Sequence, residues 1–143
     1  MMFSTLRKGT IIIMKTLAVC YSKTGNTKKV ADAVAEKLSC DLDELGYDET
    51  TKTIFAYYNP KDYDRVVLLS PIWAFSLSEP MKLYLGKYKA DIKIYSLIVT
   101  CSLFGLRGCV KNCISAIGKP PEKALKFKAK KVKLGAFDIG DVF

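Results

Sequence analysis

The sequence predicts an α/β domain in which a parallel sheet carries helices on both faces. Apolar segments at residues 11–20, 65–70 and 92–100 alternate with segments whose apolar residues have helical spacing. An irregular polar loop follows each of these three apolar segments. In a parallel sheet such loops meet at the carboxyl edge of the strands, where ligands bind. The length of 143 residues suits one domain with one sizeable core.

The first three elements follow from their apolar patterns. Residues 11–20 are apolar and β-branched, which predicts a buried strand. Residues 24–38 predict a helix, because apolar residues recur every four positions from Val30 onward. Residues 40–45 alternate between apolar and acidic side chains and predict a short second strand.

The middle of the chain has a weaker pattern. We expect at most a short helix within residues 49–58. Residues 65–70 predict the third strand, and residues 71–76 predict a loop with two aromatic side chains. Pro80 opens the next helix, which is expected to end near Gly86.

The last elements are placed in the same way. Residues 92–100 predict the fourth strand, and residues 107–117 predict a helix that Gly118 ends. The alternation in residues 131–137 predicts the last strand. Only six residues follow that strand, so the final helix that would cover one face of the sheet is expected to be missing.

The loop between the first strand and the first helix has the composition of an anion-binding site. Ser22, Thr24, Asn26 and Thr27 place four hydrogen-bonding side chains within six positions, and Gly25 allows a positive φ. Free N–H groups of the first helical turn and the helix dipole favour a negative group there. The alternative is that Thr24 or Asn26 only caps the helix. The loop matches neither the dinucleotide fingerprint nor the P-loop.

This loop resembles the phosphate-binding signature of the flavodoxin family, in which it wraps the phosphate of FMN. The resemblance covers residues 14–137 and implies a flavodoxin-like three-layer sandwich with a five-stranded parallel sheet of order 2-1-3-4-5. It implies FMN as the cofactor, held by three loops. The implied FMN-binding residues are Ser22, Lys23, Thr24, Gly25, Asn26, Thr27, Pro71, Ile72, Trp73, Ala74, Phe75, Thr100, Cys101, Ser102, Phe104 and Gly105.

Two aromatic residues have implied roles beside the flavin ring. By the resemblance Trp73 stacks on or edges the isoalloxazine, and Phe104 is a candidate for the other side; ordinary packing is the alternative for both. Many flavodoxins have a glycine in the second loop, whereas here Ala74 occupies the matching segment. A peptide flip that needs a positive φ at Ala74 would cost on the order of 1 kcal/mol. The one-electron-reduced flavin is therefore expected to be less stabilised than in a typical carrier.

The net charge of +9 is concentrated in the second half of the chain. Residues 1–70 hold 10 basic and 9 acidic side chains, and residues 71–143 hold 13 and 5. The alternatives are a solvated lysine-rich surface, a docking face for an acidic partner and weak non-specific nucleic-acid binding. The chain has no histidine, which excludes a Ser-His-Asp triad and leaves the chemistry to a cofactor.

The organisation of the chain suggests one flavodoxin-like domain, residues 14–143, after an N-terminal extension, residues 1–13. No apolar run is long enough to span a membrane, and no signal peptide is recognised, so a cytoplasmic location is expected. Without a final helix one sheet face needs a cover. We expect a homodimer to supply it, with residues 138–143 near the interface; a local segment such as residues 1–13 is the alternative.

Three functions fit this sequence. The first is an FMN-binding electron-transfer protein that works with a redox partner. The second is an FMN-dependent oxidoreductase that acts on a quinone or a porphyrinogen-type substrate. The third is a flavodoxin-like scaffold that binds no flavin. The colour of the purified protein separates the third from the others, and photoreduction separates the first two.

Overall fold

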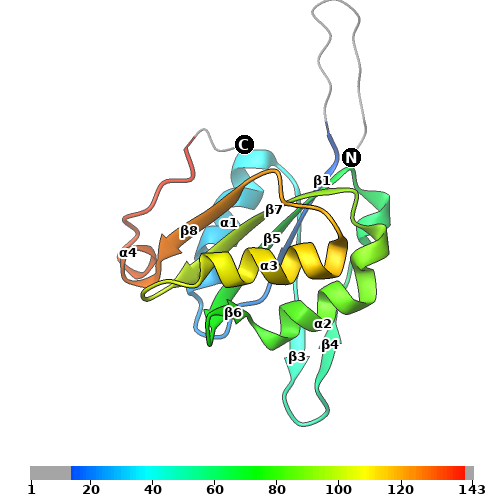
Figure 1. The fold of residues 1–143 in the computed structure, drawn as a ribbon. Coiled ribbons are helices and arrows are strands. Elements are labelled where there is room, and N and C mark those ends of the chain that lie inside the picture. The colour runs from blue at the N-terminus through cyan, green and yellow to red at the C-terminus, as the bar shows by residue number, and fades with distance from the viewer. Residues whose placement is uncertain (1–13, 141–143) are drawn as a thin grey trace, which may run out of the picture.

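The computed structural model describes residues 14–140, whose centre is a parallel sheet (Figure 1). The sheet order is β2-β1-β5-β7-β8, which confirms the predicted order 2-1-3-4-5. Each of these strands runs parallel to its neighbours. The strands are β1 (Thr16–Cys20), β2 (Asp41–Glu44), β5 (Arg65–Trp73), β7 (Ile94–Cys101) and β8 (Ala124–Lys128).

The helices lie on both faces of the sheet, as expected for an α/β sandwich. In Figure 1, α2 and α3 lie in front of the sheet and α1 lies behind it. Successive residues of β1 serve opposite faces: Leu17 packs in the α2 and α3 core, whereas Ala18 packs in the α1 core. The helices are α1 (Asn26–Leu38), α2 (Glu79–Tyr88), α3 (Leu106–Ile117) and α4 (Ala129–Lys133), with short 3-10 turns η1 (Pro60–Asp62) and η2 (Lys89–Asp91).

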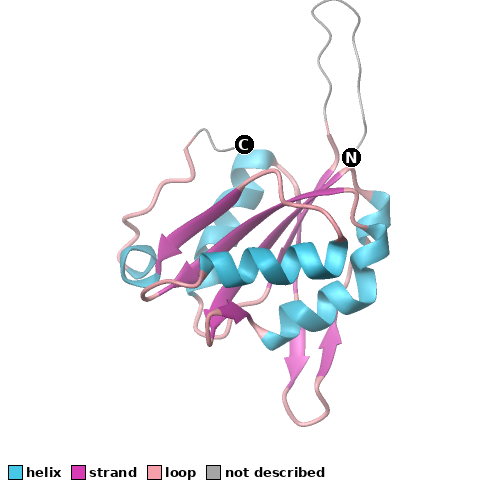
Figure 2. Ribbon diagram, in the orientation of Figure 1, coloured by secondary structure: helices cyan, strands magenta, loops and turns pink. Residues whose placement is uncertain are grey.

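A β-hairpin occupies residues 46–55, where the sequence allowed at most a short helix and predicted no strands, so the hairpin was missed. Strands β3 (Gly46–Asp48) and β4 (Thr53–Phe55) pair antiparallel and project below the sheet in Figure 2. The Asp48 carboxylate accepts the backbone N–H of Thr50 at 2.9 Å, which closes the turn. Strands of only three residues give too little alternation to be detected in a sequence.

The last strand was also placed wrongly, because β8 spans Ala124–Lys128 and not residues 131–137. Leu125 and Phe127 of β8 pack on the α1 side, and all five residues of β8 pair with β7. The residues that follow form the short helix α4, in which Val132 is fully buried. The apolar alternation around Val132 therefore reflects one short helix and the irregular segment that follows it, not a strand.

The segment after β8 covers part of the face that a full final helix would cover. Val132 and Ile139 belong to the core on the α1 side, and the ring of Phe137 meets Phe127 edge-on at 5.9 Å. A hollow of about 420 Å³ remains between α1 and residues 135–140. The homodimer stays a prediction, although this segment removes part of the reason for it. Residues 1–13, the alternative cover, lie outside the described residues, as do residues 141–143 of the tail that was expected near the dimer interface.

Smaller differences concern element ends. Strand β5 continues to Trp73, and β6 (Ser76–Leu77) folds back on it, where a patternless loop was expected. Helix α2 passes through Gly86 and ends at Tyr88. None of the helices within residues 14–140 has the length and apolar character needed to cross a membrane.

The two edge strands of the sheet carry opposite charges. Asp41 and Glu44 are exposed on β2, at one edge. Lys126 and Lys128 are exposed on β8, at the other edge.

Candidate functional site

Three loops meet at the carboxyl edge of the sheet, as the sequence predicts. The first loop (residues 21–27) follows β1, the second (residues 71–76) includes the end of β5, and the third (residues 100–105) follows β7. They enclose a cavity of about 220 Å³. Its lining residues are Lys23, Thr24, Asn26, Thr27, Pro71, Ile72, Trp73, Thr100, Cys101, Ser102 and Ala129.

The first loop is shaped by its own backbone and leads directly into α1. Gly25 has φ 98°, the positive value that its position was expected to require. The Ser22 hydroxyl accepts the Gly25 N–H at 3.1 Å, and the Gly25 carbonyl accepts the Lys29 N–H at 3.1 Å. Ser22 and Gly25 therefore form the turn, while the side chains of Thr24 and Asn26 line the cavity.

A buried hydrogen bond joins the first loop to the third. The hydroxyl oxygens of Thr27 and Thr100 lie 2.8 Å apart, and both residues are at least 96% buried. Both also line the cavity. One hydroxyl of the pair donates to the other, so the pair retains a single donor hydrogen for a ligand.

Trp73 lies at the wall of the cavity in an aromatic environment. Its ring meets the ring of Tyr21 edge-on at 5.7 Å, and Tyr21 meets Tyr47 of the hairpin at 6.0 Å. The Lys23 ammonium lies 5.8 Å from the centre of the Trp73 ring. Trp73 is only half-buried, so part of this ring remains available to a ligand.

The second and third loops form a further hollow of about 200 Å³ beside the first cavity. Phe104 stacks on Phe75 there, with ring centres 5.3 Å apart and planes 14° apart, and each residue is 61% exposed. Phe104 was expected as a partner across the ring from Trp73; in this structure its ring contact is with Phe75. The hollow is lined by Ile72, Ala74, Phe75, Cys101, Ser102, Leu103 and Phe104.

The turn of the second loop holds two non-glycine residues in the left-handed region. Ala74 has φ 50° and Phe75 has φ 65°, while Trp73 pairs with Ser76 across them. This combination is typical of a type I′ hairpin turn, which normally uses asparagine and glycine. From the sequence, a positive φ at Ala74 was expected to carry a conformational cost. This structure already has that backbone conformation at Ala74 and Phe75, at a cost of about 1 kcal/mol per residue.

Helix α3 holds this turn in place. A Cβ atom at Gly108 would lie 1.9 Å from the carbonyl oxygen of Phe75, so only glycine permits the contact. A Cβ atom at Gly105 would lie 2.7 Å from the Ile72 side chain. The Asn112 side-chain oxygen accepts the backbone N–H of Leu77 at 2.9 Å. Gly105 thus packs behind the cavity rather than lining it.

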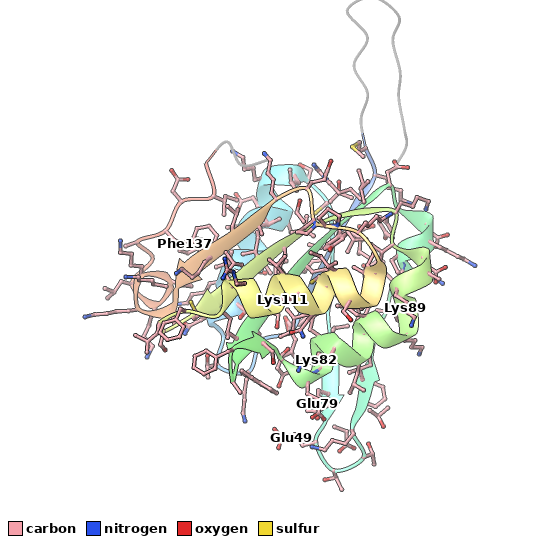
Figure 3. The ribbon with its side chains drawn as sticks, viewed as in Figure 1. Glu49, Glu79, Lys82, Lys89, Lys111 and Phe137 are labelled. Atoms are coloured by element: carbon pink, nitrogen blue, oxygen red, sulfur yellow. The ribbon has the colours of Figure 1, made fainter. Side chains whose placement is uncertain are left out.

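The hairpin forms one margin of the site. Glu49 at its tip pairs with Lys23 of the first loop at 3.5 Å. The Tyr47 hydroxyl donates to Glu79 at the start of α2, and this hydrogen bond raises the pKa of Tyr47 to about 12. Figure 3 shows Glu49 and Glu79 on the same side of the molecule, below the sheet. The hairpin therefore ties the first loop to α2.

Most of the predicted site residues lie together in the structure. Several further residues of the site were not predicted from the sequence. All of the predicted residues except Ser22, Gly25 and Gly105 line one of the two hollows. Gly108 could have been noticed as a glycine inside a helix pattern, which often marks a close contact. No local pattern could place the other missed residues, because they depend on tertiary packing. They are Tyr21, Tyr47, Leu103, Asn112 and Ala129.

Cys101 is the one thiol that lines the cavities within residues 14–140. Burial raises the pKa of the Cys101 thiol, which keeps it protonated at neutral pH. Its sulfur lies 3.8 Å from the Leu103 carbonyl oxygen, to which the thiol donates. Cys101 therefore contributes a packed, neutral thiol and a weak donor to the cavity wall.

Solved structures share this fold. The first is a flavoprotein from Lactobacillus acidophilus NCFM in complex with FMN, with a TM-score of 0.72 and 19% identity over 85% of this chain and 97% of that chain. A flavoprotein from Bacteroides uniformis ATCC 8492 has a TM-score of 0.67 and 16% identity over 85% and 96% of the two chains. A flavodoxin from the domain Archaea has a TM-score of 0.55 and 16% identity over 90% and 98%.

The sequence itself matches the flavodoxin domain over residues 18–140. The match includes all three loops of the site and every strand of the parallel sheet except the first two residues of β1. It agrees with the sheet order and with the loop between β1 and α1. This chain belongs to the flavodoxin-domain family.

Proposed function

We propose that this protein binds FMN at the carboxyl edge of its sheet and transfers electrons through it. The observation that carries the proposal is the cavity that joins the hydroxyl-rich first loop to the half-buried Trp73. A phosphate suits the first loop, and a planar ring suits Trp73. The similar flavoprotein from Lactobacillus acidophilus was solved with FMN, which supports this choice of ligand.

The chain's own residues bind and orient the cofactor. Thr24, Asn26 and the N–H groups at the start of α1 donate to the phosphate. Trp73 supplies an aromatic surface for the ring, and the third loop closes the opposite wall with Thr100 and Ser102. FMN supplies one- or two-electron transfer when bound.

The first test is the absorption spectrum of the purified protein, followed by titration of flavin-free protein with FMN and with riboflavin. We expect a flavin spectrum and much tighter binding of FMN, because the first loop binds the phosphate. A colourless protein that binds neither flavin would instead favour a scaffold without flavin. Equal affinities for FMN and riboflavin would contradict the phosphate site.

A second candidate function is an FMN-dependent oxidoreductase for a quinone or a porphyrinogen-type substrate. It is favoured by the exposed Phe75 and Phe104 rings beside the open hollow of about 200 Å³, which suit a flat apolar substrate. Photoreduction separates the two functions. A carrier accumulates a one-electron-reduced spectrum, whereas such an oxidoreductase passes directly to the two-electron-reduced spectrum.

The electron partner of the carrier is an acidic protein that docks on the lysine-rich side of the site. Lys126 and Lys128 of β8 are exposed there, and Lys128 pairs with Cys101 of the third loop. Electron transfer should slow steeply as salt is raised, because charge steers such encounters. An electron-transfer rate that does not change with ionic strength would indicate that these lysines form an ordinary solvated surface. The five free cysteines fit a cytoplasmic location.

A further inference from the structure

A third hollow lies beside the first loop and carries two lysines. It has a volume of about 340 Å³ and is lined by Asn26, Ser102, Ala129, Lys130 and Lys133. Asn26, Ser102 and Ala129 also line the cavity that contains Trp73. The two hollows therefore meet at these three residues, and a ligand in the first loop faces both.

The position of the lysines follows from the strand register. Lys128 at the end of β8 pairs with Cys101 at the end of β7, so α4 begins directly beside the third loop. The Lys29 ammonium donates to the Lys133 carbonyl at 3.4 Å, and the Lys29 backbone N–H donates to Gly25. Helix α4 is thereby linked to the first turn of α1, which carries the first loop.

The lysines bring charge to a loop that is otherwise almost neutral. Lys130 and Lys133 are exposed, and no carboxylate within residues 14–140 lies within ion-pair distance of either ammonium. The first loop contains one charged side chain, Lys23, which pairs with Glu49. Two cations that form no ion pair with the described residues therefore line a hollow that borders a loop of mostly neutral donors.

We propose that Lys130 and Lys133 bind the phosphate of FMN together with the first loop. A phosphate monoester carries a charge of about −1.5 to −2 at pH 7, and hydrogen bonds between ionised partners are about twice as strong as neutral ones. Both lysines line the third hollow, Thr24 lines the cavity, and Asn26 lines both. This inference rests on the proposed FMN binding. It adds the two positively charged side chains that offset the negative charge of the phosphate.

The test compares three single variants of the full chain, Lys130→Gln, Lys133→Gln and Lys131→Gln, with the double variant K130Q/K133Q. Lys131 is the matched control, because it lies on the same exposed helix and carries the same charge but does not line the hollow. Dissociation constants for FMN and riboflavin are measured by flavin fluorescence at low and moderate salt. Thermal unfolding confirms that every variant folds.

We expect Lys130→Gln and Lys133→Gln each to weaken FMN binding about tenfold at low salt, the effect of one lost charge-assisted hydrogen bond. Riboflavin binding should not change, and Lys131→Gln should change FMN binding less than about twofold, since it removes only distant charge. Unchanged FMN affinity in the double variant would overturn the inference. So would an equal loss for riboflavin, or an equal loss in the Lys131 control.

The two proposals fail in different ways. A parent protein that binds no FMN removes both the proposed function and this inference. A parent protein that prefers FMN to riboflavin while the double variant keeps the same preference removes only the role of the lysines. The neutral first loop would then hold the phosphate alone.

Discussion

The hydroxyl oxygens of Thr27 and Thr100 lie 2.8 Å apart, although 73 positions separate the two threonines in the chain. Thr27 is the second residue of α1, and Thr100 lies near the end of β7, two strands away from β1 in the sheet. Their hydrogen bond fixes the distance between the first and third loops. The site therefore depends on the assembled sheet and not on one local motif.

Replacing Thr27 with valine should affect both stability and FMN binding. The variant leaves the buried Thr100 hydroxyl without its partner, which should cost about 1–3 kcal/mol in the free energy of unfolding. Thr24→Val is the matched control, because Thr24 is exposed and lines the cavity. It should weaken FMN binding and leave stability within about 0.5 kcal/mol. Urea unfolding and FMN titration of both variants decide this, and equal stability losses would contradict it.

Replacing Gly108 with alanine should move the turn at Ala74 and Phe75. The new methyl group would clash with the Phe75 carbonyl, so the second loop or helix α3 must move. We expect this to lower the free energy of unfolding by about 1–3 kcal/mol. Gly86→Ala is the control, since a Cβ there meets nothing within 4 Å and helical propensity predicts a gain of about 0.5–1 kcal/mol. Thermal unfolding measures both changes. A Gly108→Ala protein with parental stability and FMN affinity would show that the contact has no role.

Removing the Tyr84 hydroxyl should stabilise the protein. Tyr84 is fully buried, and its hydroxyl has no hydrogen-bond partner among residues 14–140. Tyr84→Phe keeps the ring and should raise the free energy of unfolding by about 1 kcal/mol. Tyr95→Phe is the contrast, because the Tyr95 hydroxyl donates to the Lys119 carbonyl at 2.6 Å and its loss should destabilise by a similar amount. Denaturant unfolding that ranks the two variants in the reverse order would refute the argument.

Stability should fall above about pH 9. Burial raises the pKa of the Cys20, Cys109 and Cys113 thiols from 9.0 to about 12. Burial also raises the pKa of Tyr84 above its usual 10.0. The folded state therefore keeps protons that the unfolded state loses, so this stabilisation is complete below pH 9 and is lost as pH rises through the folded-state values. Urea unfolding under reducing conditions between pH 8 and 11 measures it, and a stability that stays constant or rises would disprove it.

The local parts of this fold could be predicted because their signals are local. The four-residue spacing from Val30 identifies α1, and the apolar run before Ser70 identifies β5. The first loop was found because its hydroxyls and Gly25 are contiguous. These features needed no knowledge of which segments pair.

The parts that could not be predicted depend on distant partners. Strand β8 is short and carries lysines at alternate positions, so only its pairing with β7 distinguishes it from a loop. Since β8 was placed too late in the chain, α4 could not be recognised, nor could Lys130 be placed beside the first loop. The hairpin depends in the same way on Glu79 of α2, which Tyr47 and Lys52 both contact.

The opposite charges of the two sheet edges limit how copies of this chain can add strands to one another. Two β8 edges repel through Lys126 and Lys128, which protects that edge from pairing with itself. The acidic β2 edge, with Asp41 and Glu44, likewise repels its own kind. A β2 edge and a β8 edge attract, so a sheet extension would join unlike edges head to tail, which builds a ring or an open filament rather than a two-fold pair. High salt would dissociate such assemblies, because it screens the attraction between the two edges: the Debye length falls to about 3 Å at 1 M ionic strength.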